Sequence, residues 1–161
     1  MKLFDWYKRW RHGRGYGVHS PSAYALVRDV LRPGSKYAFY AYDKLKLRRW
    51  GGSMTVAEQE LVYRLFVHFQ PSEITVYLPE GADGCLQKIA AIALPEARVR
   101  TVPAERLSVV TPEFEYYPDP ADPRLAQHWD ALAQGHLFRN PHRALLVPNP
   151  KLPKQIFEVK Y

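Results

Sequence analysis

A glycine-containing turn between two apolar segments is the stretch of this sequence best placed to hold a ligand. The turn spans 79–85 (Pro-Glu-Gly-Ala-Asp-Gly-Cys), after the apolar segment 74–78 and before the apolar run 86–94. The pattern predicts a buried strand, a turn and a helix, so that the turn and the helix N-terminus can face a nucleotide-like ligand. The position of the turn suits a cofactor site, but its chemistry is unusual for one.

A second glycine-rich stretch, 12–21 (His-Gly-Arg-Gly-Tyr-Gly-Val-His-Ser-Pro), could cradle a phosphate, with Arg11 and Arg14 supplying positive charge. Ser20 is a good N-cap, so a helix is expected to follow and to reach about Leu31. The glycines do not match a Walker loop, and no strand is predicted before them. Phosphate binding here is therefore the weaker of the two ligand hypotheses.

Other catalytic chemistry has little support. The six His residues lack the i, i+4 spacing of a helical zinc site, and no Gly-x-Ser-x-Gly elbow is present. We interpret His136 and His142 as ordinary loop residues and predict no metal site. The lone Cys85 excludes an internal disulfide and indicates a reducing, cytoplasmic location. A helix dipole would lower its pKa and make it reactive, although packing at a tight turn is the commoner role.

Positive charge is concentrated at the N-terminal end. Residues 1–50 carry twelve Lys and Arg against three Asp, a net of +9, whereas the whole chain carries +7. Eleven of the 22 aromatic residues also fall there. This basic, aromatic arm suggests an acidic partner such as nucleic acid or an anionic membrane surface. A solvated helical arm whose aromatics dock on the core, or on a second subunit in a homodimer, explains it equally well.

The predicted helices and strands indicate a single globular α/β domain without a membrane span. Tyr24, Val27, Val30 and Leu31 share one face of the helix after Ser20, which predicts that this face is buried. Thr55 to Glu58 is a capping box that opens a strongly periodic helix. The predicted helices are 3–10, 21–31, 37–50, 56–69, 86–94 and 124–134, and the predicted strands are 74–78, 98–102, 144–147 and 155–161, with an edge strand within 108–117.

The segment 17–21 (Gly-Val-His-Ser-Pro), followed by Tyr-Ala-Phe-Tyr at 37–40 and a basic helix, resembles a bacterial group of class I S-adenosylmethionine-dependent methyltransferase-like proteins. The resemblance covers about 5–105. It implies a Rossmann-like, mostly parallel sheet, here truncated, over 53–161, preceded by a helical extension over 1–52. It also implies S-adenosylmethionine as the cofactor, over Gly81, Asp83 and Gly84, with Glu105 near its ribose.

The cofactor motif departs from this family in several places. Tyr77 stands where the family has an acidic residue, and Pro79 stands where it has the first glycine. Proline fixes φ and removes a backbone N–H where the cofactor would approach closely. The acid expected after the second strand falls near Pro103, with Glu105 close by. Compared with the family, the remainder of the chain is also short by at least one crossover helix and strand.

Two functions are therefore expected from different classes. The first is a methyltransferase-like protein with impaired or lost cofactor binding; if it is active, proximity and orientation would carry catalysis, with His19 the candidate general base. The structural alternative for His19 is a bond to its own loop backbone. The second is a non-enzymatic binding protein that uses the basic arm, whose expected anion or nucleic-acid contacts are Arg9, Arg11, Arg14, Lys44, Arg48 and Arg49.

Overall fold

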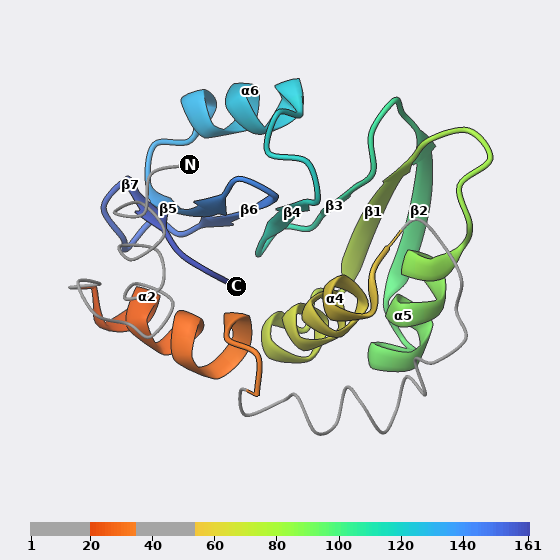
Figure 1. The fold of residues 1–161 in the computed structure, drawn as a ribbon, viewed down its shortest axis with the longest axis horizontal. Coiled ribbons are helices and arrows are strands. Elements are labelled where there is room, and N and C mark those ends of the chain that lie inside the picture. Colours follow the sequence, from red (N-terminus) through yellow and green to blue (C-terminus); the bar gives the residue numbers. More distant parts are fainter. Residues whose placement is uncertain (1–19, 35–53) are drawn as a thin grey trace.

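The computed structural model describes residues 20–34 and 54–161, which form one seven-stranded sheet with helices on both faces (Figure 1). The expected helices over 3–10 and 37–50 lie outside the described residues. Within the described ranges, no helix is long and apolar enough to cross a membrane.

The first part of the sheet is a strand–helix–strand unit. Helix α4 (Val56–Phe69) leads into β1 (Glu73–Leu78), and helix α5 (Cys85–Ala93) connects β1 to β2 (Arg98–Pro103). Strands β1 and β2 pair in parallel along their whole length, as the sequence predicts. The capping box of α4 is also confirmed, because the Thr55 side chain accepts from the Glu58 backbone and the Glu58 side chain accepts from the Thr55 backbone.

The second part of the sheet is built mainly from antiparallel pairs. The remaining elements are β3 (Ser108–Val110), β4 (Glu115–Tyr117), α6 (Pro123–Ala131), β5 (Gly135–Asn140), β6 (Arg143–Pro148) and β7 (Gln155–Glu158). The strand order is β2-β1-β3-β4-β6-β5-β7. Only β1–β2 and β5–β7 are parallel among the described pairs. The expectation of a mostly parallel sheet was wrong: the α/β fold is consistent with a Rossmann-like class, but its sheet is mixed.

Two strand assignments made from the sequence are corrected. The expected edge strand within 108–117 is in fact two short strands, β3 and β4, in the middle of the sheet. His136, interpreted as a loop residue, lies in β5, is buried and packs edge-on against the stacked rings of Phe138 and Phe157. His142 lies in the exposed turn between β5 and β6, as expected. Strand β5 was missed because Leu137 and Phe138 are its only large apolar residues, too short a run to predict a strand.

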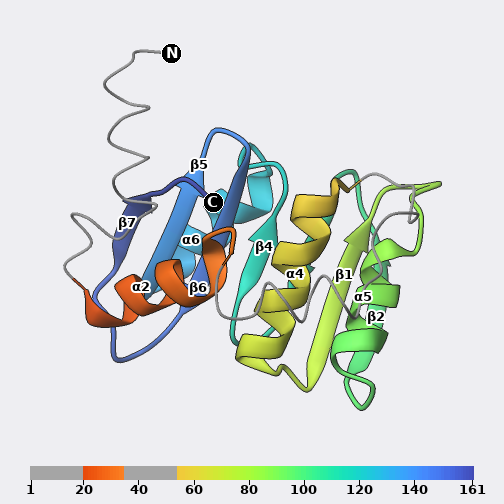
Figure 2. The ribbon, with the colours of Figure 1, turned by 60° about the horizontal axis from the view of Figure 1, so that its bottom comes forward.

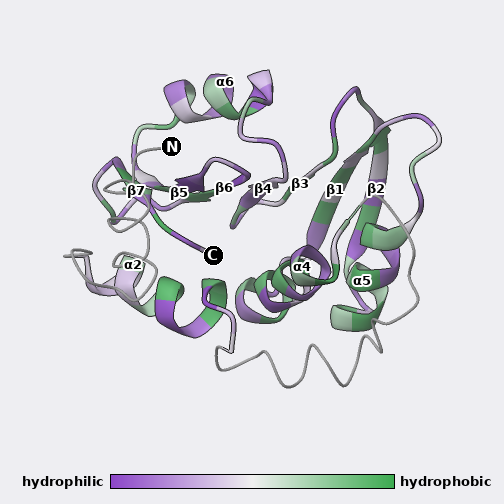
Figure 3. Ribbon diagram, viewed as in Figure 1, coloured by the Kyte–Doolittle hydropathy of each residue, from purple (hydrophilic) through white to green (hydrophobic). Residues whose placement is uncertain are grey.

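The sheet separates two hydrophobic clusters. The larger cluster lies on the face covered by α2 (Pro21–Leu26), η1 (Val27–Leu31), α4 and α5, and the smaller one lies under α6 (Figures 1 and 2). Hydrophobic and hydrophilic residues alternate around α4 and α6 (Figure 3), as expected of helices with one buried side. In the α2–η1 segment, Val27, Val30 and Leu31 are buried as predicted, but Tyr24 is exposed beneath the Arg28 guanidinium.

Candidate cofactor site at the end of the first strand

The connection from β2 to β3 passes across the carboxyl end of β1. Strand β2 pairs with one side of β1 and β3 pairs with the other, so the four residues 104–107 must cross from one side to the other. The Ala104 N–H donates to the Leu78 carbonyl at 2.9 Å, which attaches the crossing segment to the end of β1. In an open α/β sheet this end is where a ligand crevice would form. Here the chain itself covers it.

The turn after β1 carries the predicted contacts Gly81, Asp83 and Gly84. Gly81 has a φ of +76°, which favours glycine, while Gly84 caps α5 without a side chain. One oxygen of Asp83 accepts from the Cys85 N–H at 3.4 Å, and its other oxygen is buried without a partner among the described residues. The carboxylate of Asp83 therefore already stands at the helix N-terminus, where it disfavours a second anion.

The expectation of a lowered pKa for Cys85 was wrong. The Cys85 side chain is buried in the larger cluster, and burial raises the pKa of its thiol, with the neighbouring charge of Asp83 adding to the increase. Burial removes the water that would solvate a thiolate, which favours the neutral thiol. Packing at a tight turn is the role that the geometry supports.

Arg124 covers the ring of Tyr77, the residue that stands where the methyltransferase family has an acid. The Arg124 guanidinium lies 4.4 Å from the ring centroid of Tyr77, donates to Asp122 and, at 2.9 Å, donates to the Arg106 carbonyl. The side chain of Asp122 also caps α6 by accepting from the Arg124 N–H at 2.9 Å. Burial alone would raise the pKa of Asp122, but the hydrogen bonds and charge of Arg124 outweigh it and hold that pKa below its usual value. The arrangement ties α6, the crossing segment and β1 together.

The fourth predicted contact, Glu105, is placed apart from the other three. Its exposed side chain borders a shallow depression of about 200 Å³ between the crossing segment and the start of α6, lined also by Arg106 and Arg124. None of Gly81, Asp83 and Gly84 lines this depression. Its volume is below the roughly 300 Å³ at which small-molecule pockets begin.

The remaining predicted site residues cannot be placed. The candidate base His19 and the expected anion contacts Arg9, Arg11, Arg14, Lys44, Arg48 and Arg49 all lie outside the described residues. Over residues 20–34 and 54–161, no cluster of three or more His, Cys, Asp or Glu side chains could hold a metal ion.

One cluster of titratable groups was missed by the sequence reasoning. The Tyr117 hydroxyl donates to Glu115 Oε2 at 2.6 Å, and His128 Nδ1 lies 2.7 Å from the same oxygen. Burial, followed by the hydrogen bond to Glu115, raises the pKa of Tyr117 well above its usual value. The three residues do not line the depression beside Glu105. They attach α6 to β4, and the signal was the i, i+2 spacing of Glu115 and Tyr117 on one strand face.

No protein-family model, curated protein or solved structure matches this chain. The likeness to methyltransferases therefore depends on its motif residues alone.

Proposed function

We propose that this chain is a methyltransferase-like α/β protein that has lost the binding of S-adenosylmethionine and acts by binding rather than by catalysis. The observation that carries the proposal is the crossing of the carboxyl end of β1 by residues 104–107, fixed by the hydrogen bond between Ala104 and Leu78. A crevice at that end is what a nucleoside-type ligand requires in an open α/β sheet.

The residues around the crossing also fit the cofactor poorly. Tyr77 supplies no carboxylate for a ribose diol and is itself covered by Arg124. Pro79 offers no N–H to the ligand, and Asp83 places a negative charge at the N-terminus of α5, where a cofactor carboxylate would otherwise be stabilised. Glu105 is the remaining acid, and it borders a depression that Gly81, Asp83 and Gly84 do not line.

Calorimetric titration of S-adenosylmethionine and S-adenosylhomocysteine into the full chain tests the proposal. We expect no heat of binding at millimolar ligand. Micromolar binding of either compound would overturn it and would restore the methyltransferase hypothesis, with a search for the methyl acceptor as the next step.

A second candidate function is favoured by the charge of residues 1–50, a net of +9 on an otherwise near-neutral chain. In this function the basic arm binds an acidic partner, and nucleic acid is the first to test. We expect binding of a short DNA duplex to weaken steeply with salt, because each phosphate contact releases counterions. The variant Arg9→Glu/Arg11→Glu/Arg14→Glu should abolish this binding, while Arg98→Glu, in the edge strand β2, should leave most of it. Equal binding by both variants would exclude the arm.

A further inference from the structure

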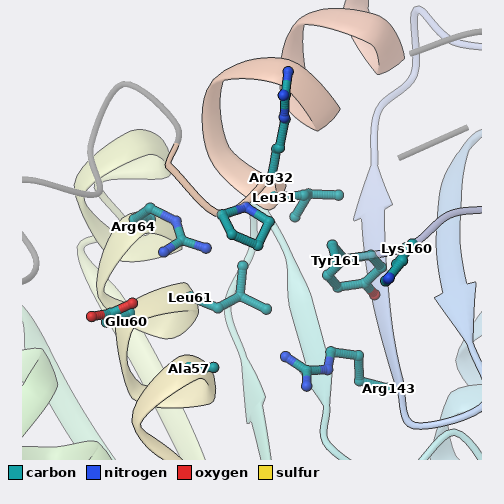
Figure 4. Close-up of a pocket in the computed structure, with 10 residues that line it drawn as sticks. Leu31, Arg32, Ala57, Glu60, Leu61, Arg64, Arg143, Lys160 and Tyr161 are labelled. Carbon is teal, nitrogen blue, oxygen red and sulfur yellow. The ribbon is translucent and has the colours of Figure 1, made fainter. Parts of the chain in front are cut away.

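A cavity of about 450 Å³ lies between the end of η1, residues 57–64 of α4 and the C-terminal residues, on the face of the sheet with the larger hydrophobic cluster. Figure 4 shows Arg64 from α4 and Arg143 from β6 both extending into the space between α4 and Tyr161. The volume is that of a small-molecule pocket. Its residues belong neither to the turn after β1 nor to the crossing segment, so ligand binding in this cavity is independent of the loss of the cofactor.

Arg64 is a buried arginine of α4, on the side of the helix that also carries Leu61 and Glu60. Only 3% of the residue is exposed, and its Nε donates to the Val30 carbonyl at 2.7 Å, which leaves the rest of the guanidinium at the cavity. Burial lowers the pKa of Arg64, the charge of Glu60 opposes this, and the charge of Arg143 lowers it further. The positive charges of Arg143 and Arg64 therefore repel each other.

Arg143 approaches from the sheet. Its Nε is buried and has no hydrogen-bond partner among the described residues. Within residues 20–34 and 54–161, neither Arg143 nor Arg64 forms an ion pair with a carboxylate. A buried cation without a counterion costs several kcal/mol in general, so an anion that entered this cavity would relieve a cost that the protein otherwise carries.

The remaining lining defines the kind of anion. Arg32 and Lys160 add two basic side chains, and Glu60 is the only acidic side chain among the described residues that line the cavity. Leu31, Leu61 and the Tyr161 ring supply apolar walls. The Tyr161 hydroxyl does not compete for the ligand, because it donates to the Phe138 carbonyl at 2.9 Å.

We propose that this cavity binds a small molecule with an apolar body and an oxyanion, a phosphate or a carboxylate, held between Arg64 and Arg143. The planar fork of each guanidinium matches two oxygens of either group, and such charge-assisted bonds are the strong ones. The apolar walls would contact the body of the ligand.

Three probes of similar size test the proposal on the full chain: phenyl phosphate, benzoate and the neutral benzyl alcohol. We expect at least one anion to bind with a Kd below about 1 mM and to raise Tm as its concentration rises, because binding to the native state stabilises it. Benzyl alcohol should bind at least tenfold more weakly, a difference in the range of charge-assisted bonds. Tighter binding of phenyl phosphate points to a phosphate ester, and tighter binding of benzoate points to a carboxylate.

The variants Arg64→Met and Arg143→Met keep the side-chain length and remove the charge. Each variant should lower the affinity for the anion at least tenfold without changing the affinity for benzyl alcohol. The matched control is Arg98→Gln, which removes one positive charge from an exposed arginine of β2 and should bind as the wild type does. Circular dichroism and urea unfolding verify that each variant is folded. Arg64 also donates a hydrogen bond to the Val30 carbonyl, so Arg64→Met can fail to fold. In that case the Arg143→Met variant alone tests the proposal.

Two results would overturn the proposal. One is that neither anion binds the wild type at about 10 mM. The other is that a folded Arg143→Met protein binds the anion as tightly as Arg98→Gln does, since the affinity would then come from the overall charge of the protein rather than from this cavity.

Discussion

Two pairs of arginines in this protein have opposite electrostatic surroundings. At the carboxyl end of β1, Arg124 is paired with Asp122 and Arg106 is paired with Asp119. In the cavity beside α4, Arg64 and Arg143 have no carboxylate partner among the described residues and oppose each other. The charges of Arg106 and Arg124 are neutralised by carboxylates of the protein itself. The charges of Arg64 and Arg143 are not, so they can attract an anionic ligand.

The difference shows how a site can be distinguished from a structural contact. A buried cation that is matched by a carboxylate has its desolvation cost offset within the protein, so a ligand gains little by approaching it. A buried cation without such a match keeps that cost until an anion arrives.

The largest effect is expected from breaking the matched pair at the sheet end. Asp122→Ala removes both the N-cap of α6 and the partner of a largely buried arginine, so we expect the free energy of unfolding to fall by about 3 kcal/mol. Urea unfolding at pH 7 measures it. Asp119→Ala is the matched control: that pair is half exposed, and its loss should cost less than about 1 kcal/mol. Equal losses in the two variants would mean that burial does not distinguish them.

A gain in stability, rather than a loss, is expected in the cavity. Arg143→Met removes a partly buried charge that has no carboxylate partner among the described residues, together with its repulsion of Arg64, so we expect the free energy of unfolding without added anions to rise by about 1 kcal/mol. The exposed Arg98→Gln should change it by less than about 0.5 kcal/mol. A loss above about 1 kcal/mol for Arg143→Met would show that Arg143 has a stabilising partner, and the comparison would fail.

The smallest expected effect is a dependence of stability on pH that comes from His136. This residue is buried on the same face of the sheet as the cavity, and its Nε2 has no hydrogen-bond partner among the described residues. Burial lowers the pKa of His136 below 6.5 in the folded protein. Above about pH 6.5 the imidazole is neutral in both states. As the pH falls below that value the unfolded chain gains a proton and the folded one does not, so stability decreases until the folded pKa is reached.

Comparing urea unfolding of the wild type and His136→Leu at pH 8 and pH 6 isolates this contribution from the other histidines. The wild type should lose more stability between the two pH values, by an amount below about 1 kcal/mol, the limit set at pH 6 by an unfolded pKa of about 6.5. Identical losses would mean that the pKa of His136 is the same in the folded and the unfolded chain, so that burial does not lower it.

The sequence predicted the parts of the fold whose signals are local. The capping box at Thr55 and the period of α4 depend on residues within a few positions of each other, and both were confirmed. Strand direction could not be predicted in the same way, because the antiparallel pairing of β3 with β1 depends on contacts between segments more than 30 residues apart. Tyr24 was assigned to the buried face from spacing alone, but it is exposed and its ring contacts the Arg28 guanidinium at the surface.

The candidate sites were predicted less well, for a physical reason. The turn at 79–84 was recognisable as a short motif, whereas its closure by residues 104–107 depends on which side of β1 the next strand joins. The cavity had one local signal that was missed: Arg64 follows Leu61 by three residues on the buried stripe of α4, where a cation is costly. Its partner Arg143 comes from β6, nearly 80 residues later, and no spacing rule connects the two.

Strand β2 has a further consequence for the behaviour of the protein in concentrated solution. Within the described part of the chain it has a neighbour on one side only, and five of its six residues are exposed, so its free edge could recruit a strand from another molecule. Arg98 and Arg100 place like charges along that edge, and Pro103 ends it without an N–H donor. Two such edges brought together would repel each other, which protects an otherwise exposed strand against aggregation.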